Sequence, residues 1–318
     1  MLDFIQEVID LSDKIDDRRR FHEAAKPWLL KMGTPEYIHK VFEMNLMDNG
    51  FLQRKWSTYE TPFLYLFENN HFYLKYHVFL TVKSMDVEKT TNIIHHHNNY
   101  LLSSLAAFGS GYYTIHYDKK IVSNPDGTHS LKRTRDFNHL PGEISFVDSY
   151  EPHVVFNPSE LSATTVLWSP DKKQITDNLR NHPLVKPFKK LLIRIIHFFG
   201  ASRQLGVAEE NVCQYYLENG KYYAVKETEI FESFKAEMGP EVDDYYINAL
   251  ALFMQKTNYK NTSFLNQMIK KETTPETWKK YLTQLANGEP INEVYGRETL
   301  YIPNGEMRKE DLLRAPSI

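Results

Sequence analysis

Cysteine and long apolar runs are the scarcest features of this sequence. The 318 residues include a single cysteine, Cys213, so an internal disulfide and a cysteine-based zinc site are both excluded. The most apolar segment, from Leu184 to Phe199, is interrupted by four basic residues and is too short to span a bilayer. The N-terminus is acidic and lacks the basic start and apolar run of a signal peptide. We therefore expect a cytoplasmic protein with no membrane partner.

Charge of either sign is not in excess. The formal net charge is −3, so no overall field favours nucleic acid or anionic membranes. Residues 171–318 hold 21 Lys and Arg against 20 Asp and Glu, whereas a DNA-binding domain normally carries a basic excess. The sequence also lacks a glycine-rich phosphate loop and a serine nucleophile elbow. We therefore expect no nucleic-acid partner.

Aromatic residues are abundant, with 20 Tyr and 19 Phe. Such a composition suits a β-sheet core or a pocket for a bulky apolar ligand. Periodicity then divides the chain into three regions. Residues 1–55 predict helices, residues 56–170 predict a β-rich domain, and residues 171–318 predict a second helical domain. The expected fold class is therefore α+β, with helical regions on both sides of a central β-domain.

Helix signals are clear at both ends of the chain. Thr34-Pro35-Glu36 predicts a helix start, because proline is tolerated at the first helical position. An apolar stripe predicts a helix over 184–199, and further helices are expected over 243–256 and 275–285. Cys213 falls in this region and is predicted to be a packed residue in a helix.

The central region reads as short strands separated by turns. Aromatic and β-branched residues are dense in the following segments: Phe63–Phe67, Phe72–Val82, Tyr112–Tyr117, Glu143–Val147 and His153–Phe156. Glycine, asparagine and proline mark the turns between them. Several short strands at this spacing predict a sandwich or a barrel.

The most informative residues are three consecutive histidines, His95, His96 and His97. On a strand, alternate side chains face opposite sides of the sheet, so His95 and His97 would share a face and His96 would point away. Two imidazoles on one inward face can bind one metal ion. A third ligand must then come from elsewhere in the sheet.

The residues around this pair resemble the first motif of the cupin family, which runs His-x-His, four residues, Glu, six residues, Gly. This sequence has His95-x-His97, four residues, Leu102, six residues and Gly109. Leucine thus stands where many cupins carry a glutamate ligand.

A second segment resembles the other cupin motif, which runs Gly, five residues, Pro-x-Gly, two residues, His, three residues, Asn. This sequence has Gly142, five residues, Asp148-x-Tyr150, two residues, His153, three residues and Asn157. The Pro-x-Gly of the family is lost. The resemblance covers about residues 60–170 and leaves both helical flanks unexplained.

This resemblance implies a double-stranded β-helix that holds one metal ion through His95, His97 and His153. Three-histidine sites are found in the thiol dioxygenases among the cupins, which use iron, so Fe(II) is expected here and Zn, Ni, Mn and Cu are alternatives. Gly109 and Gly142 would sit at turns that need a permissive backbone. Three neutral ligands leave the charge of the metal uncompensated, which favours an anionic substrate, O2 or hydroxide at the open positions.

Other residues are candidates for the pocket. Tyr112 and Tyr113 are candidate catalytic residues, because an inward tyrosine could orient a bound oxygen or substrate. Candidate substrate-binding residues or sources of supporting hydrogen bonds are His71, His77, Asn99, Ser103, Ser104 and His116.

A second ligand set is also present in the sequence. His116-x-Asp118 has the His-x-Asp form of 2-oxoglutarate oxygenases, which share this general fold. His139 or His153 would complete the triad, and Arg180 would bind the co-substrate carboxylate. Against this set, Asp118 leads directly into a polar hairpin.

The function expected first is a non-haem metal oxygenase that acts on a small molecule with O2, the helical regions covering the barrel or building a homodimer. A zinc-dependent isomerase or hydrolase is an alternative, because zinc at the same site would activate water. A transcription regulator made of a cupin and a helical domain is another, although the charge balance of residues 171–318 argues against it.

Overall fold

The structure is a computed structural model that describes residues 3–58, 60–84, 86–172, 213–226, 238–296 and 307–315. The chain begins with helices, as predicted: α1 (Asp3–Lys14), α2 (Arg18–Met32), α3 (Pro35–Met47) and α4 (Asn49–Leu52). Thr34 is the N-cap of α3 and Pro35 is its first residue, which confirms the predicted helix start. Within the described part of the chain, no helix is long and apolar enough to cross a membrane.

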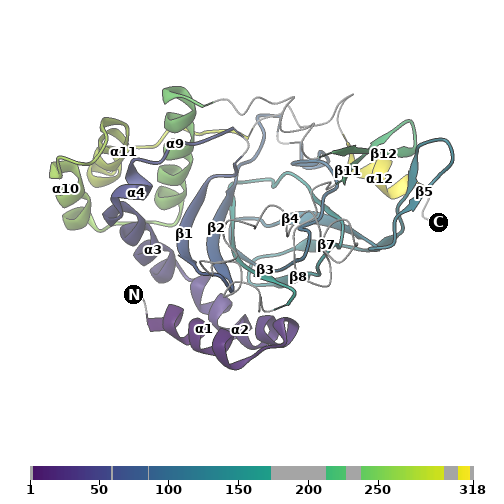
Figure 1. Cartoon of the computed structure of the whole chain (residues 1–318). Coiled ribbons are helices and arrows are strands. Elements are labelled where there is room, and N and C mark those ends of the chain that lie inside the picture. The colour runs from purple at the N-terminus through teal and green to yellow at the C-terminus, as the bar shows by residue number, and fades with distance from the viewer. Residues whose placement is uncertain are drawn as a thin grey trace, which may run out of the picture.

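Two antiparallel sheets form the centre of the molecule (Figure 1). The larger sheet has five strands in the order β1 (Phe63–Glu68), β2 (Tyr73–Phe79), β10 (Ser162–Pro170), β3 (Tyr100–Phe108) and β8 (Ile144–Val147). The smaller sheet has the order β7 (Arg133–His139), β4 (Tyr112–Tyr117) and β9 (His153–Val155).

The pairing of these strands shows how the chain winds. The ribbon of β3 and β4 pairs with β8 and β7 on one side and with β10 and β9 on the other. Each two-stranded ribbon thus runs through both sheets. This winding is a double-stranded β-helix, which confirms the expected α+β fold with a cupin-type core.

Successive side chains of β2 alternate between the core shared with the helices and the interior of the barrel. Leu74, Tyr76 and Val78 are fully buried and belong to the apolar core shared with the helices. His77 and Phe79 alternate with them and face the interior of the barrel. A strand covered on both faces therefore reads as a nearly continuous apolar and aromatic run.

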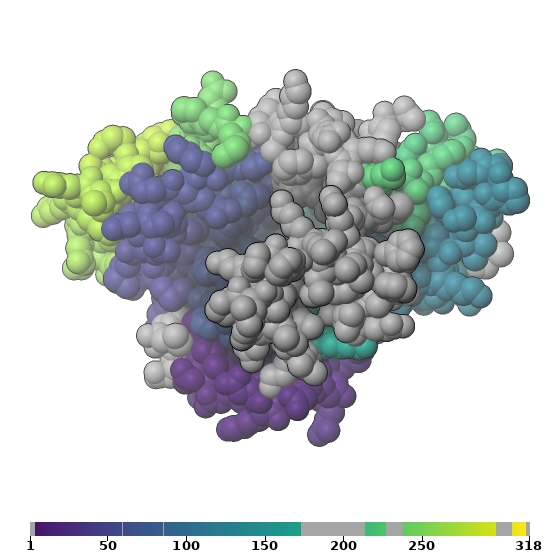
Figure 2. Space-filling view, viewed as in Figure 1, coloured from purple at the N-terminus to yellow at the C-terminus, as the bar shows by residue number. Residues whose placement is uncertain are grey.

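Helices cover the outer face of the larger sheet. The later helices are α9 (Pro240–Lys256), α10 (Thr262–Lys270) and α11 (Glu276–Asn287), which agree with the helices predicted over 243–256 and 275–285. Trp56 and Tyr246 of α9 stack with ring centroids 5.1 Å apart, so the N-terminal and C-terminal helices share one core with the sheet. In Figure 2 these helices occupy the left and lower parts of the molecule.

The helical interpretation of residues 171–318 is wrong for one segment. β11 (Cys213–Glu218) and β12 (Lys221–Lys226) form a hairpin that pairs with β6 (His129–Ser130), itself paired with β5 (Val122–Ser123). Cys213 therefore begins a strand. The alternating aromatics of this segment, such as Tyr215 and Tyr222, are buried in a second core closed by α12 (Lys309–Arg314). The helix predicted over 184–199 lies outside the described residues.

Candidate metal centre

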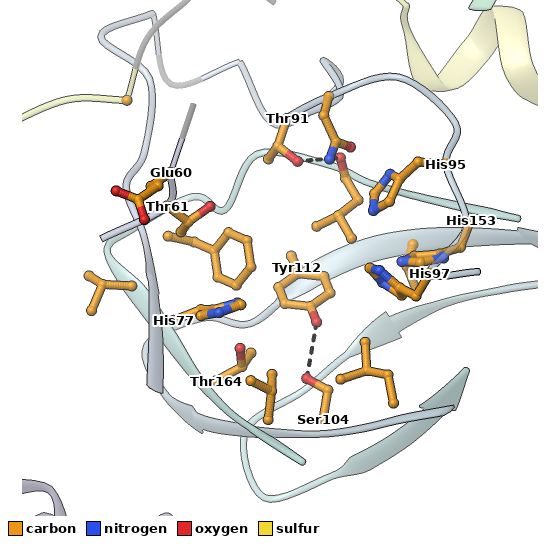
Figure 3. A pocket seen from close by; sticks show the side chains of 18 of the residues that line it. Glu60, Thr61, His77, Thr91, His95, His97, Ser104, Tyr112, His153 and Thr164 are labelled. Carbon is orange, nitrogen blue, oxygen red and sulfur yellow. Dashed lines mark hydrogen bonds between the residues drawn. The ribbon is translucent and has the colours of Figure 1, made fainter. Parts of the chain in front are cut away.

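His95, His97 and His153 come together in the structure. Each offers one ring nitrogen, and these three atoms all lie within 4.8 Å of one another. An isolated antiparallel bridge places His95 opposite His153, with reciprocal backbone hydrogen bonds of 3.0 and 2.9 Å. The segment of the predicted His-x-His strand forms only single bridges, at Ile94 and His95, and His97 lies just beyond them. Figure 3 shows the three rings side by side at one wall of the cavity.

His97 supplies the clearest sign of a missing partner. Its ring contacts Trp168 edge to face, with centroids 4.0 Å apart, and its Nε2 atom is buried with no hydrogen-bond partner among the described residues. A buried ring nitrogen without a partner is costly, and such atoms call for an explanation. Ligand nitrogens about 2.1 Å from one ion are separated by roughly 3.4 Å. The three rings therefore fit a metal ion after a small closing movement of the side chains.

All three imidazoles are held in the neutral form that binds metals. Burial lowers the pKa of His95, and burial together with the neighbouring rings holds the pKa values of His97 and His153 well below the usual histidine range. The Nδ1 atom of His95 lies 3.0 Å from the carbonyl oxygen of Ile93. Because a carbonyl only accepts, Nδ1 carries the proton and the lone pair is on Nε2. The site thus offers neutral nitrogen ligands near pH 7.

Within the described part of the chain, no carboxylate joins the three histidines. Leu102, which replaces the glutamate of the cupin motif, is buried and lines the cavity. Across the described ranges, no other group of three metal-binding side chains comes together. A divalent ion held here would keep its full positive charge. Charge compensation would then fall to whatever occupies the remaining coordination positions.

A cavity of about 480 Å³ opens next to the histidines inside the barrel. Four candidate residues from the sequence line it, namely His77, Ser104, Tyr112 and His116. His77 projects from β2, and burial lowers its pKa to about 4. Tyr112 projects from β4, with its hydroxyl 3.4 Å from Ser104 Oγ (Figure 3), and burial raises its pKa to about 12. Both side chains are therefore uncharged at neutral pH.

Tyr113 does not belong to this cavity, contrary to the sequence-based expectation. The residue lies next to Tyr112 on β4, so its side chain points to the other face of the sheet. There its hydroxyl donates to Asp136 Oδ1 at 2.5 Å, and the Lys309 ammonium lies 3.7 Å from its ring centre.

Ser103, Asn99 and His71 also lie outside the cavity lining. Ser103 is on the outer face of β3, where its hydroxyl contacts His22 of α2. Asn99 is buried in the turn before β3. His71 lies in the turn before β2, and its carbonyl accepts from Arg18. These three predictions are corrected, because strand phase and turn position direct their side chains elsewhere.

His116 lines the cavity, but not as part of a His-x-Asp site. Its Nδ1 atom lies 2.9 Å from Glu151 Oε1, and its ring stacks on His153 with centroids 5.6 Å apart. Asp118 instead accepts from the backbone of Lys120 at 2.8 Å, beyond the end of β4. The second ligand set is therefore not assembled. Arg180 lies outside the described residues.

The turns of both motifs have the backbone that the family pattern requires. Gly109 and Gly142 have φ of +85° and +83°, as expected. Tyr150 stands where the second motif has glycine, and it adopts a φ of +58°. Its amide donates to Asn98 at 2.7 Å, and its ring lies 5.6 Å from that of His96. These contacts hold a tyrosine in the left-handed conformation, so the loop before His153 keeps its shape without Pro-x-Gly.

Three cavity residues on β10, Thr164, Val166 and Trp168, were missed from the sequence. Trp168 contacts His97, and Thr164 faces the cavity four residues earlier on the same strand. The signal that could have found them is the alternation Thr164, Val166, Trp168, since all three line the cavity.

The sequence matches no protein-family model and no curated protein. Among solved structures, an RmlC-like cupin with a double-stranded β-helix from Methanocaldococcus jannaschii is 14% identical, with a TM-score of 0.23, and the likeness covers 37% of this chain and 83% of that one. The cupin domain of Schizosaccharomyces pombe Cnp3 is 12% identical, with a TM-score of 0.24 and coverages of 37% and 68%.

The core is a cupin-type barrel. The strand pairing establishes this fold, since the TM-scores with solved structures are low. An oxalate oxidase is also among the similar structures, at 13% identity and a TM-score of 0.21, with coverages of 42% and 63%.

Proposed function

We propose that this chain binds one transition-metal ion through His95, His97 and His153, Fe(II) first among the candidates, and that it is an oxygenase acting on a small molecule in the barrel cavity. The observation that carries the proposal is the buried, unpartnered Nε2 of His97, placed beside two further neutral imidazoles. Imidazole nitrogen suits iron, zinc, copper and nickel.

The number of protein ligands favours a catalytic role for the metal over a structural one. Three protein ligands leave coordination positions open, which is the arrangement of catalytic sites, whereas structural sites are closed. A bound iron ion would supply the electron chemistry with O2 that protein side chains lack. The resemblance to three-histidine thiol dioxygenases favours this reading over a purely structural ion.

The chain itself would bind and orient the substrate. The cavity walls would hold the reacting groups at close range, which lowers the entropic cost of their encounter. The Tyr112 phenol keeps its proton at neutral pH, because burial raises its pKa to about 12. It can therefore donate a hydrogen bond into the cavity. His77 offers a neutral imidazole from the neighbouring wall.

Metal analysis of full-length protein purified without a histidine tag tests the site. We expect about one transition-metal ion per chain in the wild type and little in His97→Ala and His153→Ala, because two remaining imidazoles hold an ion far more weakly. His129→Ala is a matched control, since His129 lies on β6 in another sheet. Equal metal content in all four proteins would contradict the proposal.

Oxygen consumption separates the two activities that this ligand set suits. The iron-loaded protein should consume O2 while it converts its substrate, and His153→Ala should not. Zinc as the resident metal, with no oxygen uptake in the iron-loaded form, would instead favour the isomerase or hydrolase alternative, in which the site activates water.

A further inference from the structure

The cavity has a second polar end, away from the three histidines. Trp168 touches His97, while Thr164 lies four residues earlier on β10. At about 3.3 Å per residue, these positions are roughly 13 Å apart along the strand. Val166 lies between them on the strand and packs in one apolar cluster with Leu102, which lies opposite Trp168. The cavity therefore runs from the histidines past this apolar cluster to Thr164, with Ser104 opposite Val166 and the Tyr112 hydroxyl next to Ser104 (Figure 3).

Among the described residues, the hydrogen-bonding groups of Thr164 and of the neighbouring Tyr112–Ser104 pair are not fully satisfied. The side chain of Thr164 is 1% exposed, and its Oγ1 atom has no hydrogen-bond partner in the described part of the chain. The contact between Tyr112 and Ser104 is 3.4 Å long, well beyond the usual 2.7–2.8 Å of hydroxyl pairs. An oxygen atom of a ligand would give these hydroxyls the partner that they lack.

The far end also carries no cation among the residues that the structure describes. Among the described lining residues there is no Lys or Arg, and the single carboxylate, Glu60, is paired with Arg54. The nearest cation on the inner face of β2 is Lys75, whose ammonium lies over the rings of Phe63 and Tyr73, at 4.7 and 5.2 Å. An anionic group at this end would lose its hydration without a compensating charge.

We propose that the substrate is an elongated, largely apolar molecule with an uncharged oxygen, a hydroxyl or a carbonyl, at the end distant from the three histidines. Thr164 and Tyr112 bind that oxygen and determine specificity. The role of the ligand as a substrate rests on the proposed function, but the binding preference belongs to the cavity alone and is measurable without metal.

A matched series of biphenyls tests this preference. The probes are 4-phenylphenol, biphenyl and 4-phenylbenzoate, and the protein is the full-length chain treated with a chelator. Binding is followed by calorimetry and by the fluorescence of Trp168 and the other tryptophans. We expect 4-phenylphenol to bind about three- to tenfold more tightly than biphenyl, the worth of one hydrogen bond, and 4-phenylbenzoate to bind at least tenfold more weakly than the phenol.

Substitutions locate the effect. Thr164→Val keeps the β-branched shape and removes the hydroxyl, and Tyr112→Phe does the same for the phenol, so each should reduce the preference for 4-phenylphenol over biphenyl. Thr165→Val is the matched control. Thr165 follows on the strand and does not line the cavity, so the preference should remain.

The outcomes separate this inference from the metal proposal. His153→Ala should lose metal and keep the phenol preference. A wild type that binds metal but binds phenol and biphenyl equally, or prefers the benzoate, would overturn the substrate class and leave the metal site intact. Unchanged preference in both Thr164→Val and Tyr112→Phe would overturn the assignment of these residues.

Discussion

His22 should make the stability of this protein sensitive to acid. The side chain is fully buried between α2 and the outer face of the larger sheet. Its Nδ1 lies 2.7 Å from Ser103 Oγ and its Nε2 lies 2.9 Å from Ser169 Oγ. Ser169 donates its own proton to the Pro170 carbonyl, so it accepts from His22. Neutral His22 therefore ties α2 to both β3 and β10.

Burial, with smaller contributions from Arg18 and Arg19, lowers the pKa of His22 from 6.5 to about 3. A histidine with a lowered pKa in the folded state stabilises fully above the pKa of the unfolded chain, and this contribution is lost as pH falls from 6.5 towards 3. Each pH unit in that window costs about 1.4 kcal/mol. At pH 5 the loss attributable to His22 is therefore about 2 kcal/mol.

Urea unfolding at pH 7.5 and pH 5.0 measures this loss. His22→Gln keeps a neutral hydrogen-bonding side chain that does not titrate. Between the two pH values, the free energy of unfolding of the wild type should fall by about 2 kcal/mol more than that of His22→Gln. This holds whatever the difference in stability between the two proteins at pH 7.5. Ser103→Ala removes a hydrogen bond but keeps the histidine, so it should follow the wild type in its pH dependence. The same loss in wild type and His22→Gln would show that His22 does not cause the acid sensitivity.

Two further predictions concern the turns and the metal. Gly109→Ala should lower the free energy of unfolding by about 3 kcal/mol or more, because a Cβ there would lie 2.3 Å from the Leu161 carbonyl oxygen at a φ of +85°. Gly142→Ala, at a φ of +83° with no atom near the added Cβ, should lower it by only about 1–2 kcal/mol. Equal losses for the two variants in urea unfolding would contradict a role of the close contact at Gly109. Removal of metal with a chelator should lower Tm by several degrees, since a ligand at 100 times its Kd contributes about 2.7 kcal/mol. His153→Ala should show no such shift, and an unchanged Tm in the wild type would count against a bound ion.

The convergence of His95, His97 and His153 could be predicted because its signal is local. His95 and His97 are two residues apart, and the spacing around His153 follows a motif whose turns are set by a few backbone conformations. Gly142 and Tyr150 show this directly, since both have positive φ. A turn fixed by backbone geometry survives the loss of Pro-x-Gly, provided that neighbouring contacts hold the substituted residue.

The phase of a strand could not be predicted. Tyr112 and Tyr113 are adjacent, as are Ser103 and Ser104, and a shift of one residue exchanges the inward and outward members. Only pairing with strands far away in the sequence decides between them. Ser104 and Tyr112 face the cavity because β3 pairs with β10 and β4 pairs with β9.

The hairpin of β11 and β12 shows a different limit. Its alternation of aromatic residues lies between segments rich in helix formers, and its pairing partner β6 is distant in the sequence. Thr164 was missed for a related reason, since its strand carries no charged or histidine residue to draw attention. Its importance depends on a missing hydrogen-bond partner, which only the three-dimensional arrangement reveals.

Three imidazoles that bind a single ion inside the barrel should be visible as its ligands in a crystal. Anomalous diffraction from crystals of the protein, grown with the metal that it retains through purification, measures this directly. We predict one anomalous peak about 2.0–2.2 Å from a ring nitrogen of each of His95, His97 and His153. A peak at any other set of residues, or no peak between these three rings, would contradict the account.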